Sequence, residues 1–412
     1  MTSQSEPSQA DPGLFATQFG QTLLEHLYQW LAFLRQSTPA YHDPMTDIWY
    51  VARHDDVDAL LRSPHYGKDP RKASSDRGLR QIFLRAEGQT PSMLIADPPD
   101  HTRLRGLVNK AFTPRAVETL RPRVQEVVDE LLDAVAGQES FDLMAALAEP
   151  LPIRIIAEMI GVDPAHEQQF REWSRDLAAS LDANATEEQR SRADAATLGL
   201  GEYYQSVIAE HRAHPRADLI SGLIAAEEEG AHLSDVEMIS ILILLLVAGN
   251  VTTTDLIGNG VLALLEHPEQ LAKLRADPSL VTNAVEEMLR YDPPVTGAHR
   301  VALQDVEVGG CPIAAGQTLL AAVGGANRDP DAYPNPDEFD ISRGDVHHHS
   351  FGGGPHYCLG APLARLEATI AVGTLVHRFP HLRLDPSRPP VRRYLPAFRG
   401  LASLTVAVSE PS

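Results

Sequence analysis

A single cysteine stands in a glycine-rich loop near the C-terminus, in the stretch FGGGPHYCLG from Phe351 to Gly360. The glycines permit backbone conformations closed to other residues and leave room for a flat ligand against the chain. The run from Ala361 onward has the composition of a helix, so Cys358 comes just before a helix N-terminus. Free N–H groups and the positive end of the helix dipole stabilise a thiolate there, which could bind a metal or attack a substrate.

Three other interpretations compete with a functional thiolate. A lone cysteine is often an inert, small core residue. Cys358 could share a zinc ion with the histidines at 347–349, but consecutive side chains point in different directions and a second ligand pair is missing. A nucleotide-binding loop is disfavoured, because GGGPHY lacks the third glycine of the dinucleotide fingerprint and the lysine of a P-loop.

The loop resembles the haem-binding signature of the cytochrome P-450 family, and from about Phe15 onward the chain is similar to the soluble bacterial type. The matched positions are Phe351, Gly352, Gly354, His356, Cys358 and Gly360. The resemblance implies a mainly α fold with small β regions, in which a single triangular domain holds haem b (iron protoporphyrin IX) between a long central helix and the helix after Cys358. It also implies that Cys358 is the axial ligand of the haem iron, a position in which a thiolate favours O–O cleavage.

Further residues match the family's contacts to the two haem propionates, which need cations or N–H donors when they are held inside a protein. They are His101, Arg105, Arg300, His348 and His356. Taken singly, each is better explained as a solvated charge. Their joint occurrence at matching positions favours the propionate role for most of them.

The stretch AGNVTT, from Ala248 to Thr253, resembles the family's oxygen-binding segment. Small residues at Ala248 and Gly249 would let haem and dioxygen approach the helix. The hydroxyl of Thr252 would compete for a backbone carbonyl and open a groove for water. The alternative is that the threonines are merely tolerated in a buried helix.

Proton delivery to oxygen needs a substitute for the carboxylate that the family usually has at the position of Val251. Asn250 can relay a proton only through water. Asp255, three residues after Thr252 and near the same helix face, is predicted to end a water chain. The alternative is that Asp255 pairs with a neighbouring cation.

The segment EEMLR places Glu287 and Arg290 three residues apart on one helix face. By itself such a pair is ordinary surface chemistry. The resemblance implies a buried pair that braces the core beside the cysteine loop. Arg343, four residues after Phe339 in FDISR, is expected to complete it.

The elements that would position these residues are mostly helices. Apolar residues recur at three- and four-residue steps from Phe15 to Leu34 and from Pro114 to Ala136. Ser234 and Glu237 have capping-box spacing and open an apolar stretch that ends before Pro268, roughly 50 Å of helix. Such a helix must cross the interior of one large domain.

We expect that domain over residues 15–412, after a disordered tail at 1–14 that lacks the pattern of a secretory signal. Short helices bounded by proline are predicted at 268–276 and 278–291, and a small hairpin between 300 and 320. The long irregular segment after it leads to the cysteine loop.

Composition limits the location and the partners. A net charge of −21 disfavours nucleic acid as a general partner, because the phosphate backbone would be repelled. The longest apolar run, from Ile241 to Gly249, is about half of a bilayer-spanning helix, so no membrane attachment is expected. The two cysteines, Cys311 and Cys358, lie far apart in sequence, which favours a reducing compartment, the cytoplasm.

The resemblance implies a monooxygenase that activates dioxygen with two electrons and inserts one oxygen atom into an apolar small molecule. Ferredoxin and ferredoxin reductase would supply the electrons. Between His101 and Arg123 the cations exceed the carboxylate Glu118, and we expect an acidic ferredoxin to dock there. The cations are Arg103, Arg105, Lys110, Arg115, Arg121 and Arg123.

Two alternatives remain at this stage. A peroxide-driven or oxidative C–C-cleaving enzyme is suggested by Val251 and disfavoured by Thr252. A haem-thiolate gas sensor without turnover is disfavoured, because it would be expected to carry a signalling domain and no segment is left for one. The substrate itself is not determined, although the small residues at 295–298 leave room for a bulky ligand.

Overall fold

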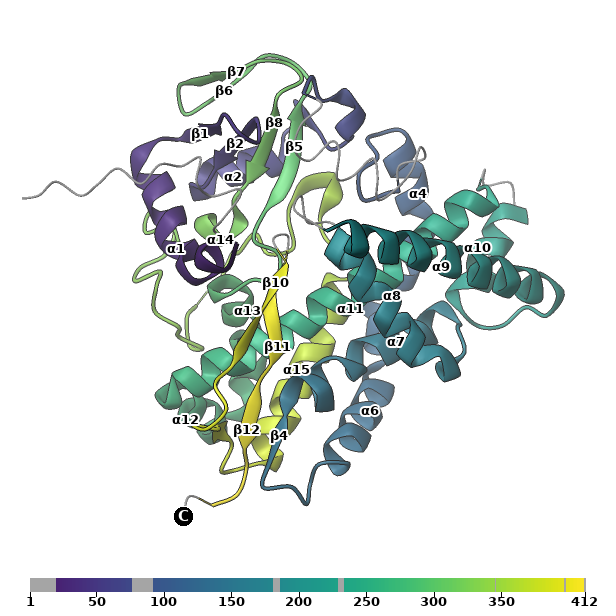
Figure 1. Cartoon of the computed structure of the whole chain (residues 1–412), viewed down its shortest axis with the longest axis vertical. Helices are drawn as coiled ribbons and strands as arrows, with labels where there is room; N and C mark the ends of the chain where they lie inside the picture. The colour runs from purple at the N-terminus through teal and green to yellow at the C-terminus, as the bar shows by residue number, and fades with distance from the viewer. Residues whose placement is uncertain are drawn as a thin grey trace, which may run out of the picture.

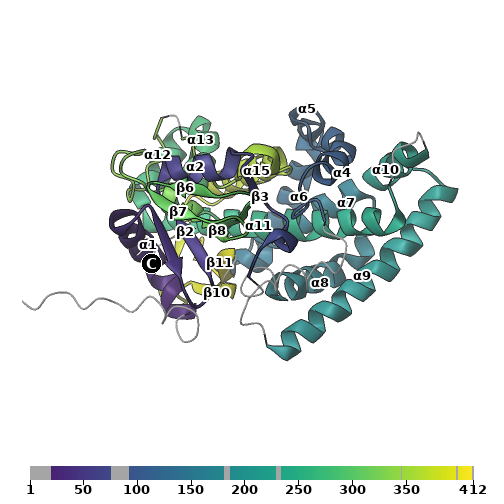
Figure 2. The same ribbon diagram turned by 90° about the horizontal axis from the view of Figure 1, so that it is seen from above.

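The structure, a computed structural model of the whole chain, describes residues 20–75, 92–180, 186–228, 233–344, 346–395 and 398–410. The tail expected at 1–14 lies outside the described residues. Helices dominate, as expected, and the largest group of strands lies in the upper left of the view in Figure 1. A view from above places the long helices α8 and α9 (Glu167–Ser180 and Glu187–Ala213) on the side away from the largest sheet (Figure 2).

The helical elements follow the apolar periodicity of the sequence, with one break. The segment from 114 to 136 forms two helices, because Pro122 has no N–H to continue the ladder through Glu118. The other helices are α1 (Gly20–Ser37), α2 (His54–Arg62), α4 (Asp100–Val108), α5 (Pro114–Glu118), α6 (Arg121–Asp133), α7 (Pro150–Ile160), α10 (Leu219–Glu228), α11 (Asp235–Glu266), α12 (Pro268–Ala276), α13 (Val281–Tyr291), α14 (Val323–Ala326) and α15 (Ala361–Arg378).

Helix α11 is the long central helix expected from the sequence. Both bonds of its capping box are present: Ser234 Oγ accepts from the N–H of Glu237 at 3.3 Å, and the Glu237 carboxylate accepts from the N–H of Ser234 at 2.9 Å. By length and composition α11 could cross a membrane. However, every residue from Asn250 to Leu264 except Thr252 is buried inside the protein, which is the pattern of a core helix.

The hairpin predicted between 300 and 320 is only part of a larger arrangement. Strands β6 (Val306–Val308) and β7 (Cys311–Ile313) form a hairpin that turns at Gly309 and Gly310, both with positive φ. The flanking segments instead enter a five-stranded sheet of order β1-β2-β8-β5-β3. Its strands are β1 (Ala40–Asp43), β2 (Ile48–Val51), β3 (Tyr66–Gly67), β5 (Ala298–Ala302) and β8 (Thr318–Ala321).

The C-terminal strands cover one side of the central helix. Strands β10 (Val391–Leu395) and β11 (Phe398–Ser403) are antiparallel, and β11 packs against α11 (Figure 1). Strand β12 (Thr405–Ala407) pairs with β4 (Ser140–Asp142) and β9 (Arg383–Leu384).

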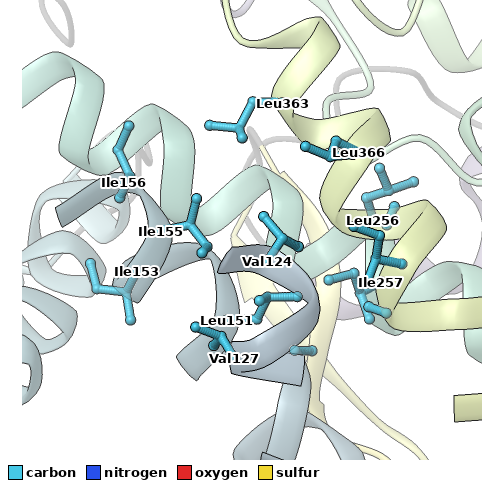
Figure 3. Packing of buried hydrophobic residues seen from close by; sticks show 14 of the residues in the cluster. Val124, Val127, Leu151, Ile153, Ile155, Ile156, Leu256, Ile257, Leu363 and Leu366 are labelled. Carbon is cyan, nitrogen blue, oxygen red and sulfur yellow. The ribbon is translucent and has the colours of Figure 1, made fainter. Parts of the chain in front are cut away.

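The main apolar core joins helices that are far apart in the sequence. Figure 3 shows side chains of α6, α7, α11 and α15 converging, with Leu256 and Ile257 of α11 close to Leu363 and Leu366 of α15. The helix after Cys358 is therefore packed directly onto the central helix.

A fully buried ion pair fixes the segment that leads to the cysteine loop. Two nitrogens of Arg290 donate to the two oxygens of Glu287, each at 2.7 Å, and both side chains have 0% exposure. The other N–H groups of Arg290 reach the carbonyls of Asn327, Pro336 and Glu338. Arg343 lies 3.3 Å from Glu287, so the expected third member is confirmed.

We expect Glu287→Ala to lower the free energy of unfolding by about 3–5 kcal/mol, because it leaves a buried guanidinium without its counter-charge. Glu307→Ala, on the exposed hairpin β6–β7, is the control and should change it by less than about 0.5 kcal/mol. Urea unfolding followed by circular dichroism measures both. Equal effects of the two changes would show that the pair is not needed for stability.

Candidate active site

The cysteine loop is shaped by glycines that other residues cannot replace. Gly352 and Gly354 have φ of +70° and +63°, a region that favours glycine. A Cβ on Gly354 would lie 2.7 Å from the carbonyl oxygen of Leu61, so the loop packs closely on α2. The N–H of Cys358 donates to the carbonyl of Phe351 at 2.8 Å and closes the loop.

The thiol of Cys358 is accessible, yet it does not lie on the outer surface. The side chain is exposed to solvent, but enough protein surrounds it for burial to raise its pKa. The backbone N–H groups of Gly360 and Ala361 and the charge of Arg105 oppose that rise only in part. The helix terminus alone therefore does not keep this thiol ionised. A bound metal ion would, because a coordinating thiol loses its proton.

One turn of α11 is also open. Ala248 is exposed between the half-buried Val247 and Gly249, and Thr252 is half-buried between the buried Val251 and Thr253. The hydroxyl of Thr252 donates to the carbonyl of Ala248 at 2.8 Å, the competition for a backbone carbonyl described above. Because α11 packs against α15, which begins beside Cys358, we infer that Ala248 and Cys358 open on one space, here called the central hollow.

Gly249 also serves the packing of its helix. A Cβ on Gly249 would come within 3.1 Å of the Ile156 side chain of α7. Its small size thus favours close packing of α11 against α7, and its expected place beside the cofactor stays a prediction.

Cationic side chains from three elements meet at one edge of the cysteine loop. The rings of His101 and His356 lie 4.0 Å apart. Arg105 donates to the carbonyl of Tyr357 at 2.6 Å. Arg300 is buried, and burial lowers its pKa to about 10. The structure thus brings together four of the five residues assigned to the propionates.

Lys68 belongs to the same cationic cluster and was not singled out from the sequence. Burial, followed by the charges of Lys68, His101, Arg300 and Arg105, lowers the pKa of His356 far below its usual value. A site in which cations repel one another in this way is suited to an anionic ligand. The signal available in the sequence was the basic run after Gly67, most of which lies outside the described residues.

His348 does not join this cluster, contrary to the expected propionate contact. Its Nε2 lies 3.2 Å from a carboxylate oxygen of Glu286, and its Nδ1 accepts from the N–H of Ser350. Arg365 binds the same carboxylate at 2.6 and 2.8 Å. Burial raises the pKa of Glu286, but the hydrogen bonds from Arg365 and His348 outweigh that effect and lower it to about 2. Both nitrogens of the His348 ring are thus engaged in hydrogen bonds within the fold, one to Ser350 and one to Glu286.

Asp255 pairs with a cation, which was the alternative to its predicted place at the end of a water chain. It is completely buried, and one nitrogen of Arg393 donates to both of its oxygens, at 2.8 and 2.6 Å. Burial raises the pKa of Asp255 to about 7 against the opposing effect of Arg393. Asn250 is buried too, and its amide oxygen is 3.5 Å from the hydroxyl of Thr254. Neither residue has a described hydrogen bond to Thr252.

The wall opposite the cysteine loop has small, partly exposed residues. Those at 295–298, the segment VTGA, are all half-buried, and so is Phe398. Val295 and Phe398 form an isolated β-bridge, so the hairpin tip adjoins this segment. The family resemblance also implies pocket walls at 66–94 and 170–184, of which the parts at 76–91 and 181–184 lie outside the described residues.

Glu367 is a buried carboxyl group that the sequence pattern did not indicate. It lies in the apolar run of α15, one residue after Leu366, and is 1% exposed. Neither carboxylate oxygen has a hydrogen-bond partner among the described residues, and burial raises its pKa well above the usual value. We therefore expect it to be protonated at neutral pH.

Glu367→Gln tests this protonation state. A neutral Glu367 holds a proton that the unfolded chain releases above about pH 4.3, so the wild type loses stability relative to the variant as pH rises, by up to about 1.4 kcal/mol per unit. Urea unfolding at pH 5 to 8 measures the difference. Glu188→Gln, on exposed α9, is the control without such a slope. Parallel curves for the wild type and Glu367→Gln would mean that Glu367 is ionised in the fold.

These residues fit a flat, dianionic group that carries a metal. The accessible sulfur of Cys358 supplies a ligand, the open turn at Ala248 leaves space, and a Cβ on Gly360 would meet nothing within 4 Å. The cationic cluster supplies the counter-charges at one edge.

Comparison with known proteins agrees with this chemistry. The family model for cytochrome P450 matches residues 155–396. Cytochrome P450 107B1 of Saccharopolyspora erythraea is 44% identical over 87% of this chain and 89% of its own length. Cytochrome P450 monooxygenase PikC of Streptomyces venezuelae is 41% identical over 98% and 96%.

Comparison of the fold with solved structures also matches cytochromes P450. The crystal structure of myxobacterial cytochrome P450 CYP267B1 in complex with myristic acid has a TM-score of 0.88 and 38% identity, and the match covers 97% of this chain and 100% of that one. The chain therefore belongs to the cytochrome P450 family, and it is a haem-thiolate monooxygenase whose cofactor is haem b.

Proposed function

We propose that the protein hydroxylates or epoxidises an apolar small molecule in the cytoplasm, with dioxygen and with electrons from a ferredoxin that ferredoxin reductase reduces. The observation that carries this proposal is the exposed Cys358 in its glycine-rich loop, directly before α15, the helix that packs against α11. Both cysteines are free, in keeping with a reducing compartment. The small residues at 295–298 leave room for a bulky apolar ligand. A structural relative was solved with myristic acid, a long apolar chain.

Haem, when bound, supplies the oxygen chemistry, and the protein supplies ligation, protons and orientation. Cys358 would bind the iron. Arg105 and Arg300, with His101, His356 and Lys68, would hold the propionates by charge-assisted hydrogen bonds. The small side chain of Ala248 would leave room for the ligand beside the helix.

Thr252 is the residue assigned to proton delivery. Its hydroxyl proton is used in the bond to Ala248, so its oxygen can accept a hydrogen bond from a water in the central hollow. A water held there could pass a proton toward dioxygen in the hollow. This arrangement favours a monooxygenase over the peroxide-driven alternative, which needs no such donor.

The reduced protein under carbon monoxide should show the strongly red-shifted Soret band of a thiolate complex. Cys358→Ala should abolish that band, because it removes the only ligand proposed for the iron. Cys311→Ala is the matched control and should keep the band, since Cys311 lies on strand β7. A Cys358→Ala protein with an unchanged carbonyl spectrum would overturn the assignment.

The proposed ferredoxin surface is narrower than the sequence suggested. Arg103 binds Glu237, Arg121 binds Glu118, and Arg123 binds Glu158, so these cations are largely neutralised. Lys110 and Arg115 are exposed near α5, which packs against α15 beside the cysteine loop. We propose that these two residues, with the exposed Tyr357, receive the electron donor.

Arg115→Glu should slow reduction of the protein by a small acidic ferredoxin several-fold at low salt, because it reverses one charge of the steering field. The difference should vanish near 0.5 M salt, where the Debye length is about 4 Å. Arg192→Glu, an exposed change on α9, which Figure 2 shows apart from α5 and α15, is the charge-matched control. Stopped-flow reduction measures the rates. Equal slowing by both variants would leave the proposed surface without a specific role.

A further inference from the structure

One face of α11 is joined to the β10–β11 hairpin by residues spaced four apart. Val251 packs with Phe398 and Ala178 in a small apolar cluster. One turn later, Asp255 binds Arg393 of β10. After another turn, the side chain of Asn259 donates to the carbonyl of Arg399 at 2.8 Å and accepts from Arg392 at 3.0 Å. Residues at i, i+4 and i+8 share one helix face, so the hairpin is fastened along that face of α11.

The middle fastening is the tightest. Arg393 and Gly400 are cross-strand partners in the hairpin, and a Cβ on Gly400 would lie 1.9 Å from a carboxylate oxygen of Asp255. The carboxylate therefore occupies the space that any side chain at position 400 would need. Because the Asp255 side chain has 0% exposure, removal of Arg393 would leave a buried charge without a partner.

A second ion-pair group holds the hairpin farther along. The carboxylate of Asp292, at the end of α13, lies 2.5 Å from Arg399 and 3.2 Å from Arg392, and it accepts from the hydroxyl of Tyr28 at 2.7 Å. The strands are thus anchored on two sides. The tip is less constrained: Phe398 is half-buried, bridges Val295 and touches Val251.

We propose that Asp255 and Arg393 are positioning residues that determine substrate specificity: their pair sets the distance between the hairpin and α11 and so holds Phe398 as a wall of the central hollow. In this view Asp255 does not end a proton chain. The proposal deepens the proposed function, since it takes the central hollow to be the site of an apolar substrate. It predicts that the pair controls which bulky apolar molecules bind, and leaves iron ligation unchanged.

The charged groups that face Asp255 give the pair a pH dependence. They are Arg393 and Arg392 from β10 and Glu149, which precedes α7 and is itself bound by Arg175. Burial raises the pKa of Asp255 to about 7, and Arg393 opposes that rise. Asp255 therefore gains a proton as pH falls from 8 to 6, and the pair weakens over that range.

Binding of two azoles of different size distinguishes an effect on the Phe398 wall from an effect on iron ligation. The azole nitrogen of econazole would bind the haem iron while its aromatic arms fill the hollow, whereas imidazole would bind the iron alone. Spectral titration of the holoprotein gives both dissociation constants, and their ratio, econazole over imidazole, reports on the wall. At pH 8 we expect Asp255→Asn and Arg393→Gln each to raise the ratio about tenfold. The double variant should raise it no further, because the two residues act as one unit.

With both constants corrected for protonation of the free azoles, the wild-type ratio should also rise as pH falls from 8 to 6, and the corrected ratio should be flat in Asp255→Asn. Asp235→Asn, an exposed change at the start of the same helix, is the control and should leave the ratio unchanged. If the tested variants lose haem, Arg393→Lys carries the test, since it keeps the charge but loses the planar fork; a smaller rise is then expected.

The outcomes distinguish failure of the proposed function from failure of the role assigned to Asp255 and Arg393. A wild-type protein without azole binding and without the thiolate carbonyl band would overturn the proposed function and this inference with it. Normal azole binding with a ratio unchanged by Asp255→Asn and Arg393→Gln would overturn the inference alone. Slower substrate turnover in Asp255→Asn, with an enlarged solvent isotope effect and an unchanged ratio, would return Asp255 to the proton-relay role.

Discussion

The burial of α11 is the constraint on which the rest of this structure depends. A helix of 32 residues with so apolar a sequence must be covered along most of its length. Helices α7, α8 and α15 and strand β11 provide that cover. The first turn of α11 and the turn at Ala248 and Thr252 are the more open parts of the helix. The second of these is the part assigned to the candidate active site.

Charges inside the protein fall into two kinds. Glu287 with Arg290, and Asp255 with Arg393, are buried pairs in which opposite charges meet at hydrogen-bond distance. Such pairs hold elements in place, because loss of either partner leaves an uncompensated charge. The cluster around His356 is different, since cations gather there and depress its pKa. The first kind is structural, and the second is prepared for an anionic ligand.

Much of the site could be predicted from local sequence. The cysteine loop, the central helix with its capping box and the pair Glu287–Arg290 depend on short spacings, which survive into the fold because helix and turn geometry are local. His348 and Asp255 are the two residues whose contacts in the structure differ most from the predicted ones. His348 contacts Glu286 and Asp255 contacts Arg393, and both partners are distant in sequence. No local pattern indicates which of many charged residues such a side chain will contact. Glu367 was missed because a single carboxyl group hardly alters an apolar pattern.

By itself, the sequence determined the helical character of the chain and the extent of its central helix, and it singled out Cys358 as the candidate metal ligand, because each follows from residue types at short range. Only the tertiary structure decided that β5 and β8 leave the predicted hairpin to join β2, that Lys68 enters the cationic cluster and that Gly249 serves helix packing. These outcomes depend on which surfaces meet when the chain closes on itself. The free energy of such contacts comes from burial and charge pairing between distant segments, and neither is encoded in the order of neighbouring residues.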